Sequence, residues 1–350
     1  MDKVLTVVLG AGASKDCVAE GEISQFDNEW RPPLTSELFA ARLNFNAIMN
    51  FYPKVSAVSE TIRIRLRNQE NLEDILQELE SSQNLQVKKQ VWEVAFYLQE
   101  LLWTVSDRFI TSGGTKFDTL VSTLLTADFD RVLFLTLNYD LLLDNALARF
   151  EDHSFGSIQD YVTENRKWAL IKAHGSVNWG RPLLNGTLAG ANPDAALGSL
   201  VESPNLSSET EIIQGSRGLL GFSGERRVSQ GRLLFPALAI PTRGEKDFAC
   251  PKEHIRQVKK FVEECTSFLF IGFSGLDPHV LELFRSVAVV NKIMVVNRDR
   301  DEGKQLLEQL QKRNARFLTT GRNEGVDQYI FDRGFRAFVE AGGLNQFLED

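Results

Sequence analysis

The stretch VLTVVLGAGAS, from Val4 to Ser14, decides the fold. Its first six residues form an apolar, β-branched run without alternation, which is typical of a strand buried on both faces of a parallel sheet. Two glycines follow directly, where missing side chains let backbone N–H groups approach a diphosphate. We therefore expect a strand over residues 4–9, followed by a ligand-binding loop that consists of Gly10, Ala11, Gly12, Ala13 and Ser14.

Similar apolar runs recur along the chain, and most of them lead into a polar or glycine-containing turn and then a helical pattern. These runs are RVLFLT (131–136), WALIK (168–172), SFLFI (267–271) and KIMVV (292–296). Strand, turn and helix in repetition is the signature of an α/β protein. The predicted fold class is therefore α/β, with a Rossmann-like, mostly parallel sheet, flanking helices and a helical insertion or second small module.

Two regions interrupt this repetition. Residues 34–128 have a helical pattern, with one apolar face made of Val91, Ala95, Leu98, Leu102, Val105 and Phe109. Residues 177–232 are rich in Gly, Ser, Asn and Pro and show little periodicity, which predicts a long loop or a lid. We thus expect a Rossmann core of residues 1–33 and 129–350 that carries this loop, and a helical insertion of residues 34–128.

Composition excludes several classes of protein. The 350 residues include 47 acidic and 39 basic side chains, a net charge of −8, which disfavours an electrostatically driven nucleic-acid binder. No apolar run is long enough to span a membrane, and the first is too short for a signal peptide. Cys17, Cys250 and Cys265 form no CxxC pair, which argues against disulfides and a structural zinc site. We expect a cytoplasmic protein without a membrane or direct nucleic-acid partner.

Polar motifs follow the other predicted strands. They are TLNYD (136–140), KAHGS (172–176), IGFSGLDPH (271–279) and VVNRD (295–299). The carboxyl ends of the strands form the ligand crevice in open α/β sheets, so these motifs should meet the glycine loop there. The candidate site residues outside that loop are Asn138, Asp140, His174, Gly272, Phe273, Ser274, Asp277 and Asn297.

The glycine loop by itself does not identify the ligand. Lys15 stands where the dinucleotide fingerprint GxGxxG/A needs a small residue, which weakens the case for a nicotinamide-dependent dehydrogenase. No GKS or GKT follows the loop, which excludes a P-loop.

The motifs GAGAS, TLNYD, KAHGS, IGFSGLD and VVN, in this order over roughly residues 8–300, resemble those of the sirtuin family. More narrowly, HGSVNW (174–179) and GFSGLDPH (272–279) are similar to the bacterial sirtuin-like NADases of antiviral defence systems. The chain departs from deacylating sirtuins because residues 177–232 contain no cysteine for a zinc module and because residues 32–38 replace the GIPDFRS segment. The resemblance therefore implies NAD binding, without zinc, and disfavours an acyl-lysine substrate.

Two candidate residues suit cleavage of the bond between nicotinamide and ribose. This reaction needs stabilisation of an oxocarbenium-like ribose and a positioned acceptor such as water. The Asn138 amide oxygen can accept a hydrogen bond from water while its NH₂ group donates to a ribose hydroxyl. His174 can take a proton from that water or from a ribose hydroxyl near neutral pH.

The resemblance implies roles for the remaining candidates. Asp140 would accept from the nicotinamide carboxamide, and Ser14 with the loop amides would hold the diphosphate. Ser274 and Asn297 would hold the adenosine end. Asp277 either binds a ribose hydroxyl or caps the helix that begins at the following proline.

The sequence thus predicts an NAD⁺ glycohydrolase, with NAD⁺ as substrate and nicotinamide and ADP-ribose as products. An NAD-dependent protein deacylase and a non-catalytic NAD or ADP-ribose-binding subunit are the alternatives. An unrestrained NADase would deplete its own cell, so we expect control by homo-oligomerisation or by a partner. As the resemblance implies, that partner would be a helicase-like ATPase or an Argonaute-type protein, and the role would be that of an effector of anti-phage defence.

Overall fold

The structure is a computed structural model, and it describes residues 3–18, 29–111, 114–163, 165–185, 193–213, 228–229, 231–239, 248–317 and 330–349. Its centre is a six-stranded sheet in which every pair of neighbouring strands is parallel. The strand order is β10-β9-β8-β1-β2-β3. The bounds are β1 (Val4–Leu9), β2 (Arg131–Thr136), β3 (Trp168–Lys172), β8 (Ser267–Ile271), β9 (Lys292–Val296) and β10 (Ile330–Phe331). Five of these strands were predicted, and the α/β fold class is confirmed.

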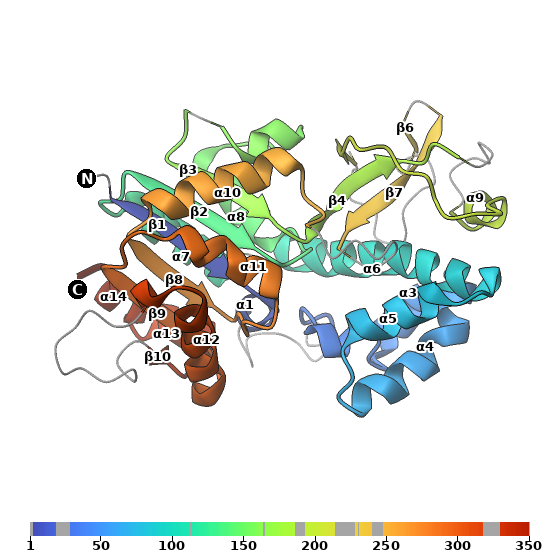
Figure 1. Ribbon diagram of the computed structural model, residues 1–350, viewed down its shortest axis with the longest axis horizontal. Coiled ribbons are helices and arrows are strands. Elements are labelled where there is room, and N and C mark those ends of the chain that lie inside the picture. Colours follow the sequence, from blue (N-terminus) through green and yellow to red (C-terminus); the bar gives the residue numbers. More distant parts are fainter. Residues whose placement is uncertain are drawn as a thin grey trace.

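Helices cover both faces of this sheet (Figure 1). Along β1, Leu5 and Val7 belong to one apolar cluster and Val4 and Val8 to the other, because successive side chains of a strand point to opposite faces. The helices beside the parallel sheet that contribute to the first cluster include α1 (Ala11–Asp16), α7 (Lys116–Thr126), α8 (Leu142–Glu151), α13 (Gly334–Glu340) and α14 (Gly343–Glu349). Those of the second are α10 (Lys252–Glu264), α11 (Pro278–Leu283) and α12 (Arg300–Arg313). Burial on both faces explains why the strands lack alternation.

Residues 34–128 are largely helical. Their elements are η1 (Thr35–Glu37), α3 (Leu43–Met49), α4 (Pro53–Arg67), α5 (Leu72–Ser81), α6 (Leu85–Thr111) and α7. The predicted apolar face lies on α6 and is buried from Val91 to Phe109. In Figure 1, α6 lies between the helices α3 to α5 and a second, smaller sheet, and it contacts both. By contrast, α7 contacts α8 and α13 beside the parallel sheet.

The second sheet corrects the expectation of a loop over residues 177–232. It is antiparallel, with the order β5-β4-β7-β6. Its strands are β4 (Gly175–Pro182), β5 (Glu211–Ile212), β6 (Val228–Ser229) and β7 (Arg232–Leu238), and the short helix α9 (Pro193–Gly198) lies between β4 and β5 in sequence. Strand β4 shows no alternation of polar and apolar residues in the sequence, because nearly all of its residues are buried, the polar ones included. Its register with β7 also shifts between Gly175 and Gly180. Residues 186–192, 214–227 and 230 of the predicted loop lie outside the described residues.

The remaining described elements are the 3₁₀ turns η2 (Ile158–Tyr161), η4 (Phe284–Ser286) and η5 (Ala315–Phe317). Among the helices that the structure describes, none combines the length and the apolar character needed to cross a membrane.

Candidate functional site

The two predicted catalytic residues lie at matching positions after neighbouring strands. In the pairing of β2 with β3, Thr136 is opposite Lys172, and Asn138 and His174 each follow two residues later. The amide of Ala173 donates to the carbonyl of Thr136 at 2.9 Å, so the pairing continues past the last strand residue. Both side chains are therefore held at the carboxyl edge of the sheet.

Asn138 is fixed by its amide NH₂ group. Nδ2 donates to the carbonyl of Gly10 and to Oγ of Ser14, both at 2.9 Å, and the residue is 8% exposed. Because a carbonyl only accepts, the bond to Gly10 settles which amide atom is nitrogen. The NH₂ group is thus engaged within the protein, and the idea that it donates to a ribose hydroxyl does not fit this arrangement. No hydrogen bond within the described part of the chain uses Oδ1 of Asn138.

Ser14 links Asn138 to the buried carboxylate of Asp140. Its hydroxyl accepts from Asn138 and donates to Oδ2 of Asp140 at 2.6 Å, while Oδ1 of Asp140 accepts from the amide of Leu142 at 3.1 Å. Burial raises the pKa of Asp140, against the opposing charge of Lys172 and the hydrogen bond from Ser14. Since its one hydroxyl proton goes to Asp140, Ser14 orients Asn138 in this conformation.

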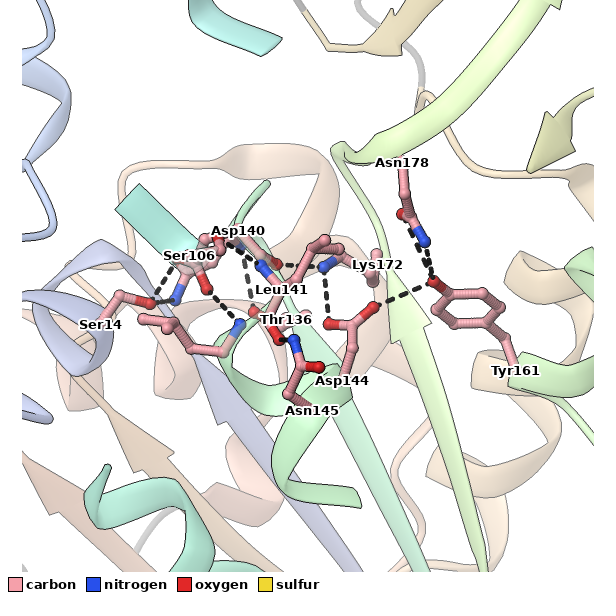
Figure 2. A network of polar contacts seen from close by, with 12 residues as sticks. Ser14, Ser106, Thr136, Asp140, Leu141, Asp144, Asn145, Tyr161, Lys172 and Asn178 are labelled. Carbon is pink, nitrogen blue, oxygen red and sulfur yellow. Dashed lines mark hydrogen bonds and ion pairs between the residues drawn. The ribbon is translucent and has the colours of Figure 1, made fainter. Parts of the chain in front are cut away.

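Behind Asp140 a buried chain of polar groups continues into the protein (Figure 2). Nζ of Lys172 donates to the backbone carbonyl of Asp140 and to Oδ2 of Asp144, the latter at 2.8 Å. Oδ1 of Asp144 accepts from the hydroxyl of Tyr161 at 3.0 Å, and that hydroxyl accepts from Asn178 at 3.1 Å. The side chain of Lys172 is fully buried.

Sequence reasoning missed this chain of polar groups. The available signal was a lysine that ends an otherwise apolar, buried strand, because an ammonium in that position needs a buried partner. Asp144 lies in the first turn of helix α8, four residues after Asp140, so Lys172 reaches its carboxylate and the backbone carbonyl of Asp140 together. These hydrogen bonds connect the loop after β2 with the end of β3, and they thereby fix the position of Asn138 relative to that of His174.

His174 pairs with Asp277 across the edge of the sheet. Nε2 of His174 lies 2.7 Å from Oδ2 of Asp277, which comes from the loop after β8. The strands β1 and β2 lie between β8 and β3, so the two loops meet above the carboxyl ends of both. The Tyr139 ring lies beside the imidazole, with 6.3 Å between the two ring centroids.

Asp277 holds His174 and also caps a helix. Its Oδ1 accepts from the amides of His279 and Val280 at 2.8 and 3.0 Å, which confirms the helix cap, one of the two roles considered from the sequence. The bond to His174 is a further role that the sequence did not indicate. Burial acts to raise the pKa of Asp277, but the hydrogen bond and charge of His174 and the two amides outweigh it, and the pKa is lowered. An ionised Asp277 places the imidazole proton on Nε2, which leaves Nδ1 as the acceptor of a neutral His174.

The two glycine-containing loops pack directly on one another. A Cβ atom at Gly10 would lie 2.4 Å from the carbonyl oxygen of Gly272, and one at Gly12 would lie 2.9 Å from its Cα. Gly272 itself has φ +58°, and a Cβ there would lie 2.2 Å from the nitrogen of Ala13. The amides of Gly10, Gly12 and Ala13 donate to the carbonyls of Ile271, Gly272 and Gly10, respectively. These glycines are therefore required by backbone packing, whatever ligand is bound.

The residues predicted for the adenosine end follow adjacent strands, β8 and β9. Ser274 is exposed after β8, while Phe273 is buried and stacks on Phe270 at 6.4 Å between ring centroids. Asn297 follows β9, and its side chain bonds to Glu302 at 3.1 Å and to the amide of Arg298 at 2.8 Å. The structure brings these residues to the same edge as the glycine loop, because Gly272 bonds to the carbonyl of Val296, which precedes Asn297.

The three cysteines are buried, and none forms a disulfide. Burial raises the pKa of Cys250 to about 12 and that of Cys265 to about 11, so both remain thiols near neutral pH. Within the described ranges, no group of three or more His, Cys, Asp or Glu side chains is arranged to hold a metal ion.

Comparison with known proteins gives matches among solved structures, and those named below have low sequence identity and low TM-scores. No family model and no curated protein matches the chain. A solved Sir2 homologue in complex with NAD is 14% identical, with 90% of this chain and 91% of that chain covered and a TM-score of 0.39. A Sir2 homologue mutant in complex with 2′-O-acetyl ADP-ribose is 12% identical, covers 91% and 95%, and also has a TM-score of 0.39.

Proposed function

We propose that this protein is an NAD⁺ glycohydrolase that cleaves NAD⁺ to nicotinamide and ADP-ribose. The observation that carries the proposal is the His174–Asp277 pair at the same sheet edge as the anchored amide of Asn138. A histidine whose proton is fixed by a carboxylate is a general base, as in hydrolytic triads. The sirtuin-like motifs supply the substrate class.

In this proposal Asn138 and His174 act on the same water molecule. Nicotinamide leaves as a neutral ring, so the protein has to stabilise the cationic ribose and supply the acceptor. Oδ1 of Asn138 accepts one hydrogen from the water, and Nδ1 of His174 accepts the other as the oxygen attacks the ribose carbon. Asp277 stabilises the imidazolium that results. The water oxygen forms the new bond to carbon while the bond to nicotinamide breaks.

The remaining candidates form the proposed binding surface. The glycine loop and the adjoining Gly272 lie against the diphosphate, and Ser274 and Asn297 line the adenosine end, with Phe273 beneath them in the same loop. Asp140 stands next to the nicotinamide, where the family resemblance assigns it a bond to the carboxamide. We further propose that Ser14 keeps the Asn138 amide in the orientation that exposes Oδ1.

The experiment is to incubate the purified chain with NAD⁺ and to quantify nicotinamide and ADP-ribose over time. Asn138→Ala and His174→Ala should each remove product release while the far-UV circular dichroism spectrum stays unchanged. His279→Gln is the matched control, because its side chain is exposed on α11 close to Asp277. Full activity of both alanine variants refutes the assignment.

Two parallel assays separate the alternatives. Release of acetate from an acetyl-lysine peptide only in the presence of NAD⁺ would identify a deacylase. NAD⁺ or ADP-ribose binding without any product from either assay would identify a non-catalytic subunit.

We also propose that activity is gated, either by self-association or by a helicase-like ATPase or Argonaute-type partner, in anti-phage defence. The support is the HGSVNW and GFSGLDPH resemblance and the toxicity of uncontrolled NAD⁺ loss. A rise in specific activity with protein concentration, matched to a rise in mass by light scattering, would establish self-association as the switch. A constant specific activity and mass over the same range would exclude it.

A further inference from the structure

A cavity of about 410 Å³ lies where the loops after β9 and β10 meet the end of α1 and the helix α13. Its wall carries four arginines, Arg31, Arg298, Arg333 and Arg336. Ligand sites commonly have volumes of roughly 300–1,000 Å³, so the cavity is large enough for a nucleotide fragment. None of its lining residues belongs to the site proposed above.

The wall of this arginine cavity is built around the buried carboxylate of Asp16. Oδ1 of Asp16 accepts from Nε of Arg298 at 3.2 Å and lies 3.9 Å from Nη2 of Arg31, and Oδ2 accepts from the backbone amide of Arg336 at 3.2 Å. Its side chain is 5% exposed. Gly334, with φ +80°, packs so closely that a Cβ there would lie 2.3 Å from Oδ2 of Asp16. The arginines therefore project from a fixed frame.

Positive charge exceeds negative charge around the arginine cavity. Asp332 and Glu340 also line it, and each already binds a further cation outside the wall, Arg300 at 3.0 Å and Lys116 at 2.8 Å. Within the described residues, six cations thus meet three carboxylates, in a chain whose net charge is −8. Such a local surplus attracts an anion.

Arg333 is pre-oriented for an anionic ligand. Its guanidinium lies over the Phe331 ring, 4.9 Å from the centroid, and the residue is exposed. None of the carboxylates in the described ranges pairs with it. A stacked guanidinium keeps its planar set of donors available for a phosphate. We propose that the arginine cavity binds a phosphate group of a nucleotide, with Arg333 as the contacting residue.

Two sources can present this phosphate. The first source is a phosphate on the adenosine ribose, as in NADP⁺. Arg298, which lines the cavity, directly follows Asn297, the residue proposed for the adenosine end, so such a phosphate faces the arginine cavity in this proposal. A separate phosphorylated ligand is the other source. The first source rests on the proposed function, whereas phosphate binding by the arginine cavity does not.

The test is calorimetric titration of the full chain with inorganic pyrophosphate, NADP⁺ and NAD⁺, the dinucleotides being titrated in the His174→Ala background to prevent turnover. Arg333→Gln should weaken pyrophosphate binding at least about tenfold, the effect of one charge-assisted hydrogen bond. Arg285→Gln is the matched control, an exposed arginine paired with Glu282 at 2.9 Å and outside the cavity. It should leave the affinity unchanged.

Each outcome decides between the possibilities. If NADP⁺ binds more tightly than NAD⁺ and Arg333→Gln abolishes the difference, the phosphate belongs to the dinucleotide. If both dinucleotides bind equally while pyrophosphate still depends on Arg333, the arginine cavity serves a separate ligand. Pyrophosphate that does not bind, or that binds equally to Arg333→Gln, overturns the proposal even if NAD⁺ cleavage is established.

Discussion

Replacement of Lys172 by methionine tests the buried polar chain most directly. Methionine keeps most of the volume and removes the ammonium, which leaves the carboxylate of Asp144 buried at 5% side-chain exposure without its ion-pair partner. Breaking one side of a buried pair costs about 3–5 kcal/mol in free energy of unfolding. The lost bond to the Asp140 carbonyl is included in this figure, since the same ammonium makes both contacts.

A double variant separates loss of the pair from loss of packing. Lys172→Met with Asp144→Leu removes both charges, and buried pairs replaced by apolar side chains are often as stable as before. We therefore expect the double variant to regain more than half of the stability lost in the single one. In that variant the Tyr161 hydroxyl loses Asp144 as an acceptor, but Oδ1 of Asn178, at 3.4 Å, can still accept its proton.

The assay is urea unfolding followed by tryptophan fluorescence, with Trp168 in the same strand as Lys172. Lys259→Met, an exposed lysine on α10, is the control and should change stability by less than about 0.5 kcal/mol. A cost below about 1 kcal/mol for Lys172→Met would refute the reasoning. So would a double variant whose loss equals the sum of the two single losses, since residues in contact should couple.

Three further predictions concern single residues. Burial lowers the pKa of His254 from about 6.5 to about 4, so on acidification the unfolded chain takes up a proton before the folded one. The free energy of unfolding should therefore fall by up to about 3 kcal/mol as pH falls from 6.5 to 4. Chemical unfolding at several pH values should show that His254→Gln removes this part of the decline. Gly272→Ala places a Cβ against the Ala13 nitrogen at positive φ, so it should cost at least about 2 kcal/mol, and an unchanged melting temperature would contradict the packing argument. Asp277→Asn keeps the helix cap but releases the ordered imidazole of His174, so nicotinamide release should fall at least about a hundredfold with unaltered folding, and a wild-type rate would exclude the dyad.

The parallel sheet could be predicted because each of its longer strands has a recognisable sequence pattern of its own. Each strand from β1 to β9 in that sheet is a short apolar run whose two faces are both covered by helices, and this needs no knowledge of distant partners. The position of Asn138 and His174 at one edge followed from the rule that parallel strands end together. The short strand β10, with two residues, offers no such run.

The second sheet could not be predicted because its strands are defined by pairing with segments that are distant in the sequence. Strand β4 pairs with β7, so that Gly175 meets Leu238 across more than sixty residues of chain. Buried polar side chains such as Ser176 and Asn178 imitate a loop in the sequence. Likewise, the sequence does not tell whether the NH₂ group of Asn138 faces the ligand or the protein. Its hydrogen bonds to Gly10 and Ser14, which come from a distant part of the chain, determine that it faces the protein.

The backbone contact between the glycine loops limits what a search for the GxG pattern can mean. Both partners in the contact are main chain, so no change of side chain at one position can make room for a Cβ at the other. Any related chain that keeps this loop packing has to keep these glycines, whether or not it has the proposed activity. The pattern is therefore a marker of this loop packing, and the proposed activity has to be judged from Asn138, His174 and Asp277.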